Sequence, residues 1–343
     1  MAQKDILNVK GHPFYQTSDV EMYLAERGAR VVGRVMAILN RAHNEFHEER
    51  TGFFGFYEVE DDPEASDGLL AAARRWLREH GAAVMRGPVN PSTNYECGLL
   101  VDAFDQDPAV MMPYNPAYYA GLIERFGMRK AMDLYAYAID ARLFRVTEKL
   151  KRVARRLKET HGVTIRPVNL RNFEHEVEIV RTIYNDAWSR NWGFVPVSRN
   201  EFEHLAKDLK QIVDPKVVYI AEKRIEGRVE PVPIGFLLAV PDVNMALKKI
   251  RGRLLPIGLF KLLWHSRKIK HLRVITMGVV REYQSLGAAA LFYEEIYKQA
   301  VSAGGYPSAE ISWVLENNVM MNRAADLVGW RRSKTYRIYE MAV

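Results

Sequence analysis

The stretch "RVITMGVVREYQSLGAAALFYEEIYKQA" (residues 273–300) decides how the second half of the chain is expected to fold. Its first residues are β-branched and apolar, which predicts a buried strand. A charged turn follows, and over residues 288–302 the apolar positions recur at helical spacing. Gly287 stands in the turn, where a glycine stabilises neither a strand nor a helix. The stretch therefore predicts a strand, a tight turn and a helix whose first residues stay free of large side chains.

A strand that ends at the N-terminus of a helix can bind an anion. The first N–H groups of the helix have no intrahelical partner, and the helix dipole adds partial positive charge there. Gly287 carries no Cβ, and the alanines at 288–290 keep the surface low, so a pyrophosphate could approach the backbone closely. The amide of Gln284 can donate a further hydrogen bond to a phosphate oxygen. We therefore predict a site for a phosphorylated ligand at residues 279–289.

The order of residues in this turn resembles the acyl-CoA-binding signature of the GNAT acyltransferase superfamily. That signature is a strand ending in Val followed by Gln/Arg-x-x-Gly-x-Gly/Ala, matched here by Val279, Gln284, Gly287 and Ala289, with Arg281 where Pro is common. Downstream, Asn318 with "GW" at 329–330 is similar to the second GNAT signature, an Asn on the helix that flanks the pantetheine arm. The resemblance covers about residues 163–343. It implies acetyl-CoA or a longer acyl-CoA as co-substrate, bound by Met277, Val279, Val280, Gln284, Ser285, Leu286, Gly287, Ala288, Ala289 and Asn318.

Acyl transfer to an amine requires a polarised carbonyl, removal of a proton from the amine and departure of the thiolate. In GNAT-like sites a backbone N–H on the strand before the turn, here at residues 277–279, holds the carbonyl oxygen. Glu310 and Glu316 flank the strand "AEISWVL", which is expected to splay open beside the thioester, and Asp186 is a third candidate base. Each of the three could equally be a solvated or ion-paired carboxylate. Cys97 is not expected to react, because direct transfer requires no nucleophile.

One feature of the GNAT pattern is missing. GNAT enzymes often place a Tyr that acts as general acid seven residues after the signature Asn, and Ala325 occupies that position here. Tyr336, on the closing strand, is the alternative acid, and it could also be an ordinary strand aromatic. The missing Tyr leaves open a second interpretation, in which the protein is a non-catalytic acyl-CoA-binding sensor or scaffold.

The two halves of the chain are predicted to be related α/β domains with mixed sheets. "NPAYYAGLIERFGMRKAMDLYAYAI" (115–139) and "NNVMMNRAADLVGWRRSKTYRIYEM" (317–341) share the order Asn, short helix, Gly, basic residues and a Tyr-containing strand. The first half carries the acidic "VEDDPEAS" instead of the glycine turn, and this would repel a pyrophosphate. We therefore expect a degenerate GNAT-like domain at 1–141, a basic linker helix at 142–162 and an acyl-CoA-binding domain at 163–343.

The acceptor is expected to be an amine-bearing small molecule or a lipid. The polar loop at 86–104 is a candidate lining for its site. Residues 243–272 combine clustered cations with apolar residues, which suits peripheral contact with a membrane or a helix packed on the N-terminal domain. With "HNEFHEERTGFFGFYEVEDD" and "SWVLENNVMMNRA", the loop resembles a group of bacterial tandem GNAT-like proteins. That group includes bacterial ceramide synthases, which acylate a sphingoid amine.

Composition narrows the remaining classes. The chain has 343 residues, a net charge of +7 and one cysteine, which suits anionic ligands and rules out a disulfide within the chain. His43 and His47 have the spacing of a zinc helix, but Asn44 replaces the required Glu and the flanks read as strand and turn, so no metal is expected. No base-reading motif accompanies the cations of residues 148–158, so no nucleic acid is expected. The sequence predicts a cytoplasmic protein, at most peripheral to the inner face of the membrane, and leaves its oligomeric state open.

Overall fold

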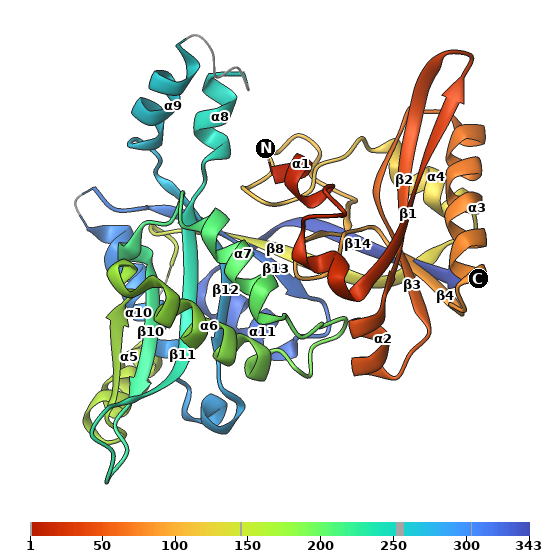
Figure 1. Cartoon of the computed structure of the whole chain (residues 1–343). Coiled ribbons are helices and arrows are strands. Elements are labelled where there is room, and N and C mark those ends of the chain that lie inside the picture. The colour runs from red at the N-terminus through yellow and green to blue at the C-terminus, as the bar shows by residue number, and fades with distance from the viewer. Residues whose placement is uncertain (1, 145, 252–256, 303) are drawn as a thin grey trace. The chain divides into compact units, whose positions relative to one another are not determined.

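A computed structural model describes residues 2–144, 146–251, 257–302 and 304–343. The chain forms two compact units, each with mixed α/β structure (Figure 1). Unit 1 contains Met1–Tyr135, Asn191–Glu201 and Lys334–Val343, and unit 2 contains Ala136–Arg190 and Phe202–Ser333. The units therefore exchange short segments, which a single cut in the sequence at 142–162 does not describe.

Unit 1 is built on a sheet with the strand order β1-β2-β3-β4-β14. The pairs β1–β2 and β2–β3 are antiparallel, whereas β3 and β4 run parallel because α3 connects them. The apolar face of α3 packs on β1, β2 and β3, and its Leu70 and Leu77 are fully buried. The elements are α1 (Ala2–Ile6), η1 (Pro13–Thr17), β1 (Ser18–Arg27), β2 (Arg30–Asn40), α2 (Arg41–His47), β3 (Thr51–Val59), α3 (Pro63–Glu79), β4 (Val84–Gly87), β5 (Val89–Asn90), β6 (Glu96–Cys97), β7 (Leu99–Leu100), α4 (Tyr118–Arg125) and β8 (Arg129–Asp140).

Unit 2 is built on the order β13-β12-β11-β10-β9. The pairs β9–β10, β10–β11 and β11–β12 are antiparallel, and β12 runs parallel to β13. Gly278 on β12 faces α6 and Gly235 on β11 faces α10, so the two helices cover opposite faces of the sheet. The elements are α5 (Glu148–Glu159), β9 (Val163–Pro167), η2 (Leu170–Asn172), α6 (Phe173–Ala187), α7 (Arg199–Leu209), η3 (Pro215–Val217), β10 (Val218–Lys223), β11 (Val232–Pro241), α8 (Asn244–Lys249), α9 (Gly258–Ser266), β12 (His271–Val279), η4 (Arg281–Leu286), α10 (Ala289–Val301), β13 (Ser308–Leu315), α11 (Val319–Val328) and β14 (Arg331–Ala342).

The similarity between residues 115–139 and 317–341 reappears in the structure. Each stretch forms a short helix, a glycine in the left-handed region and a long strand: α4, Gly127 and β8 in one, and α11, Gly329 and β14 in the other. Both strands pass from one unit to the other, since β8 enters unit 2 at Ala136 and β14 enters unit 1 at Lys334. The end of β14 pairs with β4 and β7 of unit 1. The last strand of the chain thus completes the sheet of the first unit.

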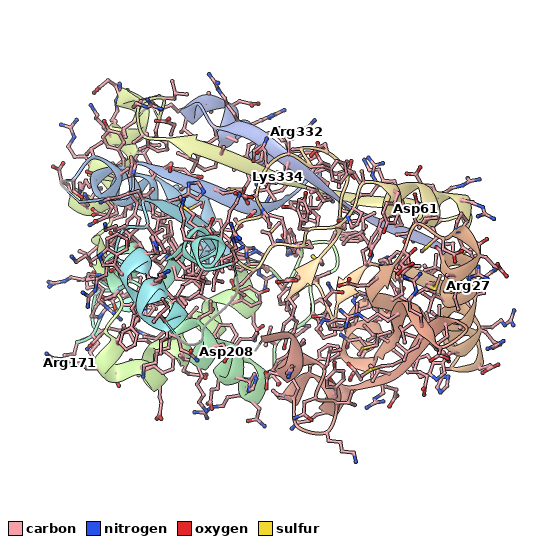
Figure 2. The ribbon with its side chains drawn as sticks, turned by 90° about the horizontal axis from the view of Figure 1, so that it is seen from above. Arg27, Asp61, Arg171, Asp208, Arg332 and Lys334 are labelled. Atoms are coloured by element: carbon pink, nitrogen blue, oxygen red, sulfur yellow. The ribbon has the colours of Figure 1, made fainter. Side chains whose placement is uncertain are left out.

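Most elements expected from periodicity are confirmed, including the strand, turn and helix of residues 273–300. The flanks of "HNEFH" are a strand and a turn, as expected, and residues 41–47 between them form the short helix α2. Its N-terminus is capped by Asn40, whose side-chain oxygen accepts a hydrogen bond from the N–H of His43 at 3.0 Å. Exposed charges of both signs occur on each unit, for example Arg27 and Asp61 in unit 1 and Arg171 and Asp208 in unit 2 (Figure 2).

Candidate functional site

The strands β12 and β13 separate along their length, as the sequence led us to expect. Parallel pairing runs from His271 opposite Ser308 to Val274 opposite Ile311. In the described residues of the two strands, it does not extend past Val274. Beyond that point β12 remains paired with β11, where Met277 lies opposite Leu237. The carboxyl halves of β12 and β13 therefore diverge. This opening presents one edge of the β12 backbone at residues 275–279 to whatever lies between the two strands.

The turn that follows β12 is braced by side chains. The backbone N–H of Arg281 donates to Asp186 at 2.7 Å, and the Arg281 guanidinium pairs with the same carboxylate at 3.2 Å. The amide nitrogen of Gln284 donates to the carbonyl of Val279 at 3.0 Å. Asp186, considered above as a base, thus holds the turn. The sequence did not reveal this pairing because the two residues lie on separate elements, α6 and η4.

Gly287 has a structural reason in addition to the one expected. Its φ of +78° lies in the left-handed region, where residues with a side chain are strained. An added Cβ would also lie 3.2 Å from Cγ1 of Val153 on α5. The glycine therefore ends η4, admits α5 close to the turn and leaves Ala288 and Ala289 to begin α10.

The N-terminus of α10 differs from that of α3, its counterpart in unit 1. No side chain caps α10, so its first N–H groups are not engaged by a cap. In α3 the side chain of Asp62 accepts hydrogen bonds from the N–H groups of Glu64 and Ala65, at 3.0 and 3.1 Å. The carboxylate of Asp62 thus occupies the place that a phosphate would need. A carboxylate at that place would repel an anion, and no carboxylate caps the start of α10.

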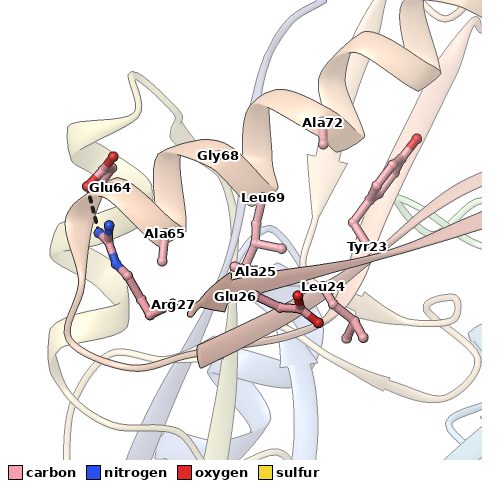
Figure 3. A pocket seen from close by; sticks show the side chains of 10 residues that line it. All are labelled: Tyr23, Leu24, Ala25, Glu26, Arg27, Glu64, Ala65, Gly68, Leu69 and Ala72. Carbon is pink, nitrogen blue, oxygen red and sulfur yellow. Dashed lines mark hydrogen bonds and ion pairs between the residues drawn. The ribbon is translucent and has the colours of Figure 1, made fainter. Parts of the chain in front are cut away.

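The surface beside the N-terminus of α3 forms a pocket, which Figure 3 shows from close by. Arg27 from β1 reaches across it and pairs with Glu64 at 2.6 Å and with Asp62 at 3.0 Å. The lining also includes Glu26, Leu69 and Tyr23. None of the residues expected from the sequence to bind acyl-CoA or to catalyse transfer lines this pocket. The Arg27 guanidinium in this pocket is already paired with carboxylates, so the pocket has no excess positive charge that would attract an anion.

The basic helix α5 lies beside the turn. It packs on α10, and Lys158 pairs with Glu294 of that helix at 2.8 Å. Lys149 and Arg156 are exposed and stand four residues before and three residues after Val153, the residue that faces Gly287. They therefore share the side of α5 that is turned toward the glycine. The sequence predicted a basic linker helix here and did not predict that it would lie beside this turn.

The candidate bases differ in their positions relative to the opening. Glu310 is buried, 4% exposed, in the paired part of β13, and its partner in register on β12 is Arg273, 5% exposed. Glu316 follows the last residue of β13, at the end where the strands diverge, and is half-buried. Its backbone carbonyl accepts a hydrogen bond from the Asn322 amide at 3.0 Å, which ties the strand end to α11. The geometry favours Glu316 as the carboxylate nearer the opening.

The other predicted residues have defined surroundings. Asn318 caps α11, because its side-chain oxygen accepts from the N–H of Met321 at 3.1 Å. Ala325, where a GNAT tyrosine is often found, is fully buried. Tyr336 belongs to unit 1, whereas Glu310 and Glu316 belong to unit 2, and its side chain is fully buried. The phenol of Tyr336 therefore has no accessible surface, and its role as an acid stays a prediction.

Trp188, considered as a pocket wall, is half-buried and packs against other aromatic side chains of unit 2. Its ring stacks on Tyr184 with centroids 4.9 Å apart and lies 5.7 Å from the ring of Phe236. A Cβ on Gly278 would fall 2.2 Å from this indole, so the glycine makes room for it. Trp192 lies in unit 1, with the Arg86 guanidinium 5.1 Å from its ring centroid.

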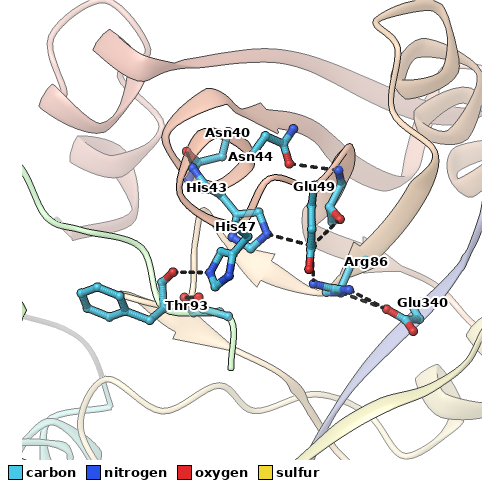
Figure 4. Close-up of polar contacts among 11 residues, drawn as sticks. Asn40, His43, Asn44, His47, Glu49, Arg86, Thr93 and Glu340 are labelled. Carbon is cyan, nitrogen blue, oxygen red and sulfur yellow. Dashed lines mark hydrogen bonds and ion pairs between the residues drawn. The ribbon is translucent and has the colours of Figure 1, made fainter. Parts of the chain in front are cut away.

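Unit 1 contains a polar cluster around His43 (Figure 4). The His43 ring lies 4.5 Å from that of His47, and its Nε2 is 3.4 Å from Glu49, which also faces Arg86. Burial lowers the pKa of the His43 imidazole to about 4, and the neighbouring His47 adds to the effect. His47 contacts the carbonyl of Phe194 at 2.6 Å. The cluster thus anchors the segment 191–201 within unit 1 through the contact of His47 with Phe194.

The polar loop at 86–104 holds the same segment. The hydroxyl of Thr93 donates to the Gly193 carbonyl, and the Asn94 amide donates to the Val195 carbonyl at 3.0 Å. Tyr95 donates to the carboxylate of Glu201 at 2.9 Å, and burial raises the pKa of that carboxyl to about 7. The expected role of the loop at 86–104 as a lining of the acceptor site stays a prediction.

Comparison with known proteins places these features in a family. No protein-family model matches the chain. It is 38% identical over 352 residues to the bacterial ceramide synthase of Caulobacter vibrioides, covering 100% of this chain and 89% of that protein. It is 34% identical over 328 residues to Protein YghO of Escherichia coli, covering 94% of this chain and 82% of that one.

Solved structures with low sequence identity share the fold. A tandem GNAT protein from the clavulanic acid biosynthesis pathway has a TM-score of 0.52 at 11% identity, covering 97% of this chain and 84% of that one. A GCN5-related N-acetyltransferase from Sphaerobacter thermophilus has a TM-score of 0.51 at 14% identity, covering 100% and 85%. In the part of the chain that the structure describes, no helix is both long enough and apolar enough to cross a bilayer. The chain has the fold of a tandem GNAT protein and belongs to the family of the bacterial ceramide synthase and Protein YghO.

Proposed function

We propose that this protein is an N-acyltransferase that moves an acyl group directly from acyl-CoA to a primary amine. Residues 163–343 would bind acyl-CoA, and residues 1–141 would form the degenerate copy that lacks a pyrophosphate site. The observation that carries the proposal is the contrast between the two helix N-termini. The helix α10 starts uncapped after a braced glycine turn, whereas Asp62 caps α3. At α10 the N–H groups of Ala290 and Leu291 bond the carbonyls of Gly287 and Ala288, at 2.9 and 3.0 Å, and no carboxylate caps the helix. A pyrophosphate could therefore approach the start of α10, whereas the Asp62 carboxylate would repel it at α3.

The proposed reaction uses the opening between β12 and β13. The pantetheine arm would lie along the unpaired edge of β12, where a backbone N–H at 277–279 would polarise the thioester carbonyl. The amine nitrogen attacks the carbonyl carbon, and a carboxylate takes the proton that the ammonium loses. The C–N bond forms and the C–S bond breaks, and the second proton, which the nitrogen loses as it becomes an amide, passes to the departing CoA thiolate. Glu316 is the proposed base because it lies at the open end of β13.

The proposed acceptor is a lipid amine of the sphingoid type. This part rests on the similarity to the Caulobacter relative, which is named a bacterial ceramide synthase and aligns with the whole of this chain. An amino acid or an aminosugar is the competing acceptor. Purified protein would be given acyl-CoA of several chain lengths with a sphingoid base, an amino acid or an aminosugar, and thiol release would be followed. Turnover with the aminosugar and none with the sphingoid base would show that the acceptor is not a lipid.

The pyrophosphate site can be tested with two separate variants that carry the same Ser-to-Glu change at opposite ends of α10. Ser285→Glu adds a negative charge in the turn before α10, and Ser302→Glu adds the same charge at the other end, both at exposed positions. Repulsion between unit charges about 5 Å apart amounts to roughly 3 kcal/mol at an effective dielectric constant of about 20. Ser285→Glu should therefore weaken CoA binding at least about tenfold. Calorimetry showing equal affinity for both variants would overturn the site.

The base can be tested by removing one carboxylate at a time. Glu316→Gln should lower kcat at least about a hundredfold without changing CoA affinity, as expected for a general base. Glu310→Gln is the matched comparison on the same strand, and its thermal stability would be measured because Glu310 is buried. Full activity in Glu316→Gln would remove this residue from the mechanism.

The alternative is a non-catalytic acyl-CoA sensor or scaffold, and the buried Ala325 at the position of the usual tyrosine favours it. Acyl-CoA binding and amine-dependent thiol release separate the two functions. Binding without thiol release across the amine panel would support the sensor. If the protein showed no acyl-CoA binding and no thiol release, both functions would be excluded.

A further inference from the structure

The surface of α9 exposes large apolar side chains that globular proteins normally bury. Leu259, Phe260, Leu263 and Trp264 are 49%, 73%, 57% and 56% exposed. Phe260 and Trp264 are four residues apart, as are Leu259 and Leu263, so the four side chains form one continuous stripe along the helix. We call these four residues the α9 stripe. A contiguous apolar patch of this kind marks an interaction site.

The stripe is exposed although the helix pair that carries it is anchored. Ala246 of α8 and Ile250 directly after it are buried, at 1% and 7% exposure, as is Ile269 after α9, at 7%. The two helices contact each other and extend beyond the ends of β11 and β12 in Figure 1. The inner side chains therefore attach this projection to unit 2, and the stripe is what remains on the outside. Residues 252–256 of the expected surface at 243–272 lie outside the described residues.

Charge around the stripe has one sign. The sequence contains no Asp or Glu from Val243 to Arg281. The exposed Lys248, Lys249, Lys261, Arg267 and Lys268 stand on or beside the two helices. Nζ of Lys268 lies 3.3 Å from the centroid of the Trp264 ring, so a cation and an indole share one place at the edge of the stripe. The partner is therefore apolar where it meets the stripe and negatively charged around it.

An anionic lipid surface matches both properties. Interfacial helices combine aromatic and aliphatic residues on one face with Lys and Arg beside them, and tryptophan prefers the level of the headgroups. The centre of a protein interface is depleted in Lys, so five cations around so short a stripe fit a protein partner less well. We propose that α8 and α9 dock unit 2 onto an anionic bilayer, with the α9 stripe entering the interface and the flanking cations facing lipid phosphates. The proposal does not depend on acyl transfer.

The test is flotation of the full chain with vesicles. One set contains phosphatidylcholine alone, and the other contains equal parts of phosphatidylcholine and phosphatidylglycerol. The protein should float with the anionic vesicles, and added salt should release it. Phe260→Ser combined with Leu263→Ser should weaken binding at least about a hundredfold, from the apolar area lost. Lys261→Glu combined with Lys268→Glu should weaken it at least about thirtyfold, as expected for basic residues near an anionic surface.

Two matched controls make the result specific to this surface. Val229→Ser removes another fully exposed apolar side chain of unit 2, and Arg152→Glu combined with Arg155→Glu changes the net charge equally on α5. Both should float like the wild type. The proposal is overturned if the protein floats with neither vesicle, or if the α5 variant loses binding as much as the α9 variant. It is also overturned if the stripe instead joins two copies, seen as a dimer that Phe260→Ser with Leu263→Ser dissociates and that ignores vesicles.

Discussion

At the scale of single residues, His43 shows what burial does to a titratable side chain. Its imidazole is 1% exposed, lies edge-on to Phe53 and faces His47, Glu49 and Arg86. Its pKa in the folded protein is about 4, against an ordinary value of 6.5. Between these values the unfolded chain takes up a proton and the folded protein does not. Stability therefore falls as the pH falls from about 6.5 to about 4.

We expect His43 to account for up to roughly 3 kcal/mol of this acid-side loss in the free energy of unfolding. Urea unfolding of the wild type and His43→Gln, repeated across this pH range, would measure it. The variant should be less stable at pH 7 but should lose less on acidification. His80→Gln, at an exposed position, is the control. A wild-type slope that His43→Gln leaves unchanged would contradict the assignment.

Glu201 predicts the opposite pH dependence. Its folded-state pKa of about 7 lies above the ordinary value of 4.5, because the carboxyl is buried beside Tyr95. As the pH rises from about 4.5 to about 7, the unfolded chain ionises first and the folded state loses stability. Glu201→Gln retains an acceptor for the Tyr95 hydroxyl and should be more stable than the wild type above pH 7, by up to roughly 3 kcal/mol. Thermal melts at pH 5 and pH 8, with the exposed Glu226→Gln as comparison, would show whether this gain appears.

At the scale of elements, α5 adds positive charge beside the turn that begins α10. Charge reversal at Lys149 and Arg156, which share the side of α5 that carries Val153, should raise KM for acyl-CoA roughly tenfold. It should leave kcat unchanged, because these cations would face the pyrophosphate end of acyl-CoA and not the thioester in the β12–β13 opening. Reversal at Arg152 and Arg155 changes net charge by the same amount away from that side. If both double variants raised KM equally, the effect would come from net charge alone.

At the scale of the whole molecule, the end of the chain completes the first unit. Arg337 of β14 pairs with Asp133 of β8 at 2.8 Å, and Asp133 is 6% exposed. Tyr339, also on β14, is buried and donates to Glu124 at 3.0 Å. Removing 334–343 would take β14 from β7 and from β4, which would keep its pairing with β3, and would leave Asp133 without Arg337. Unit 1 therefore depends on residues that lie about 200 positions after its first segment.

This dependence makes a prediction about stability. Arg337→Met should lower the free energy of unfolding by roughly 1–3 kcal/mol, because it leaves a buried carboxylate with one fewer charged partner. Arg331→Met removes an exposed cation from the same strand and should have a much smaller effect. Hydrogen exchange would report faster opening of β4 in Arg337→Met. Unchanged protection there would show that β14 does not hold unit 1.

The sequence by itself determined most elements, including the turn at Gly287 that we propose as an anion site. Apolar periodicity located the strand and helix around Gly287, because burial on one face imposes a local pattern. The acidic "VEDDPEAS" in the first half distinguishes the two halves, and its Asp62 caps α3 in the structure. These are local properties, encoded by neighbours in the chain.

Only the tertiary structure decided which distant residues meet. The brace between Arg281 and Asp186 joins residues 95 positions apart, and the approach of Val153 to Gly287 depends on how α5 packs. The different positions of Glu310 and Glu316 follow from where β12 and β13 stop pairing. The exchange of β8 and β14 between the units likewise has no local signal. Long-range pairing is selected by the fit of whole faces and strand edges, and a local pattern carries no information about which partner will be chosen.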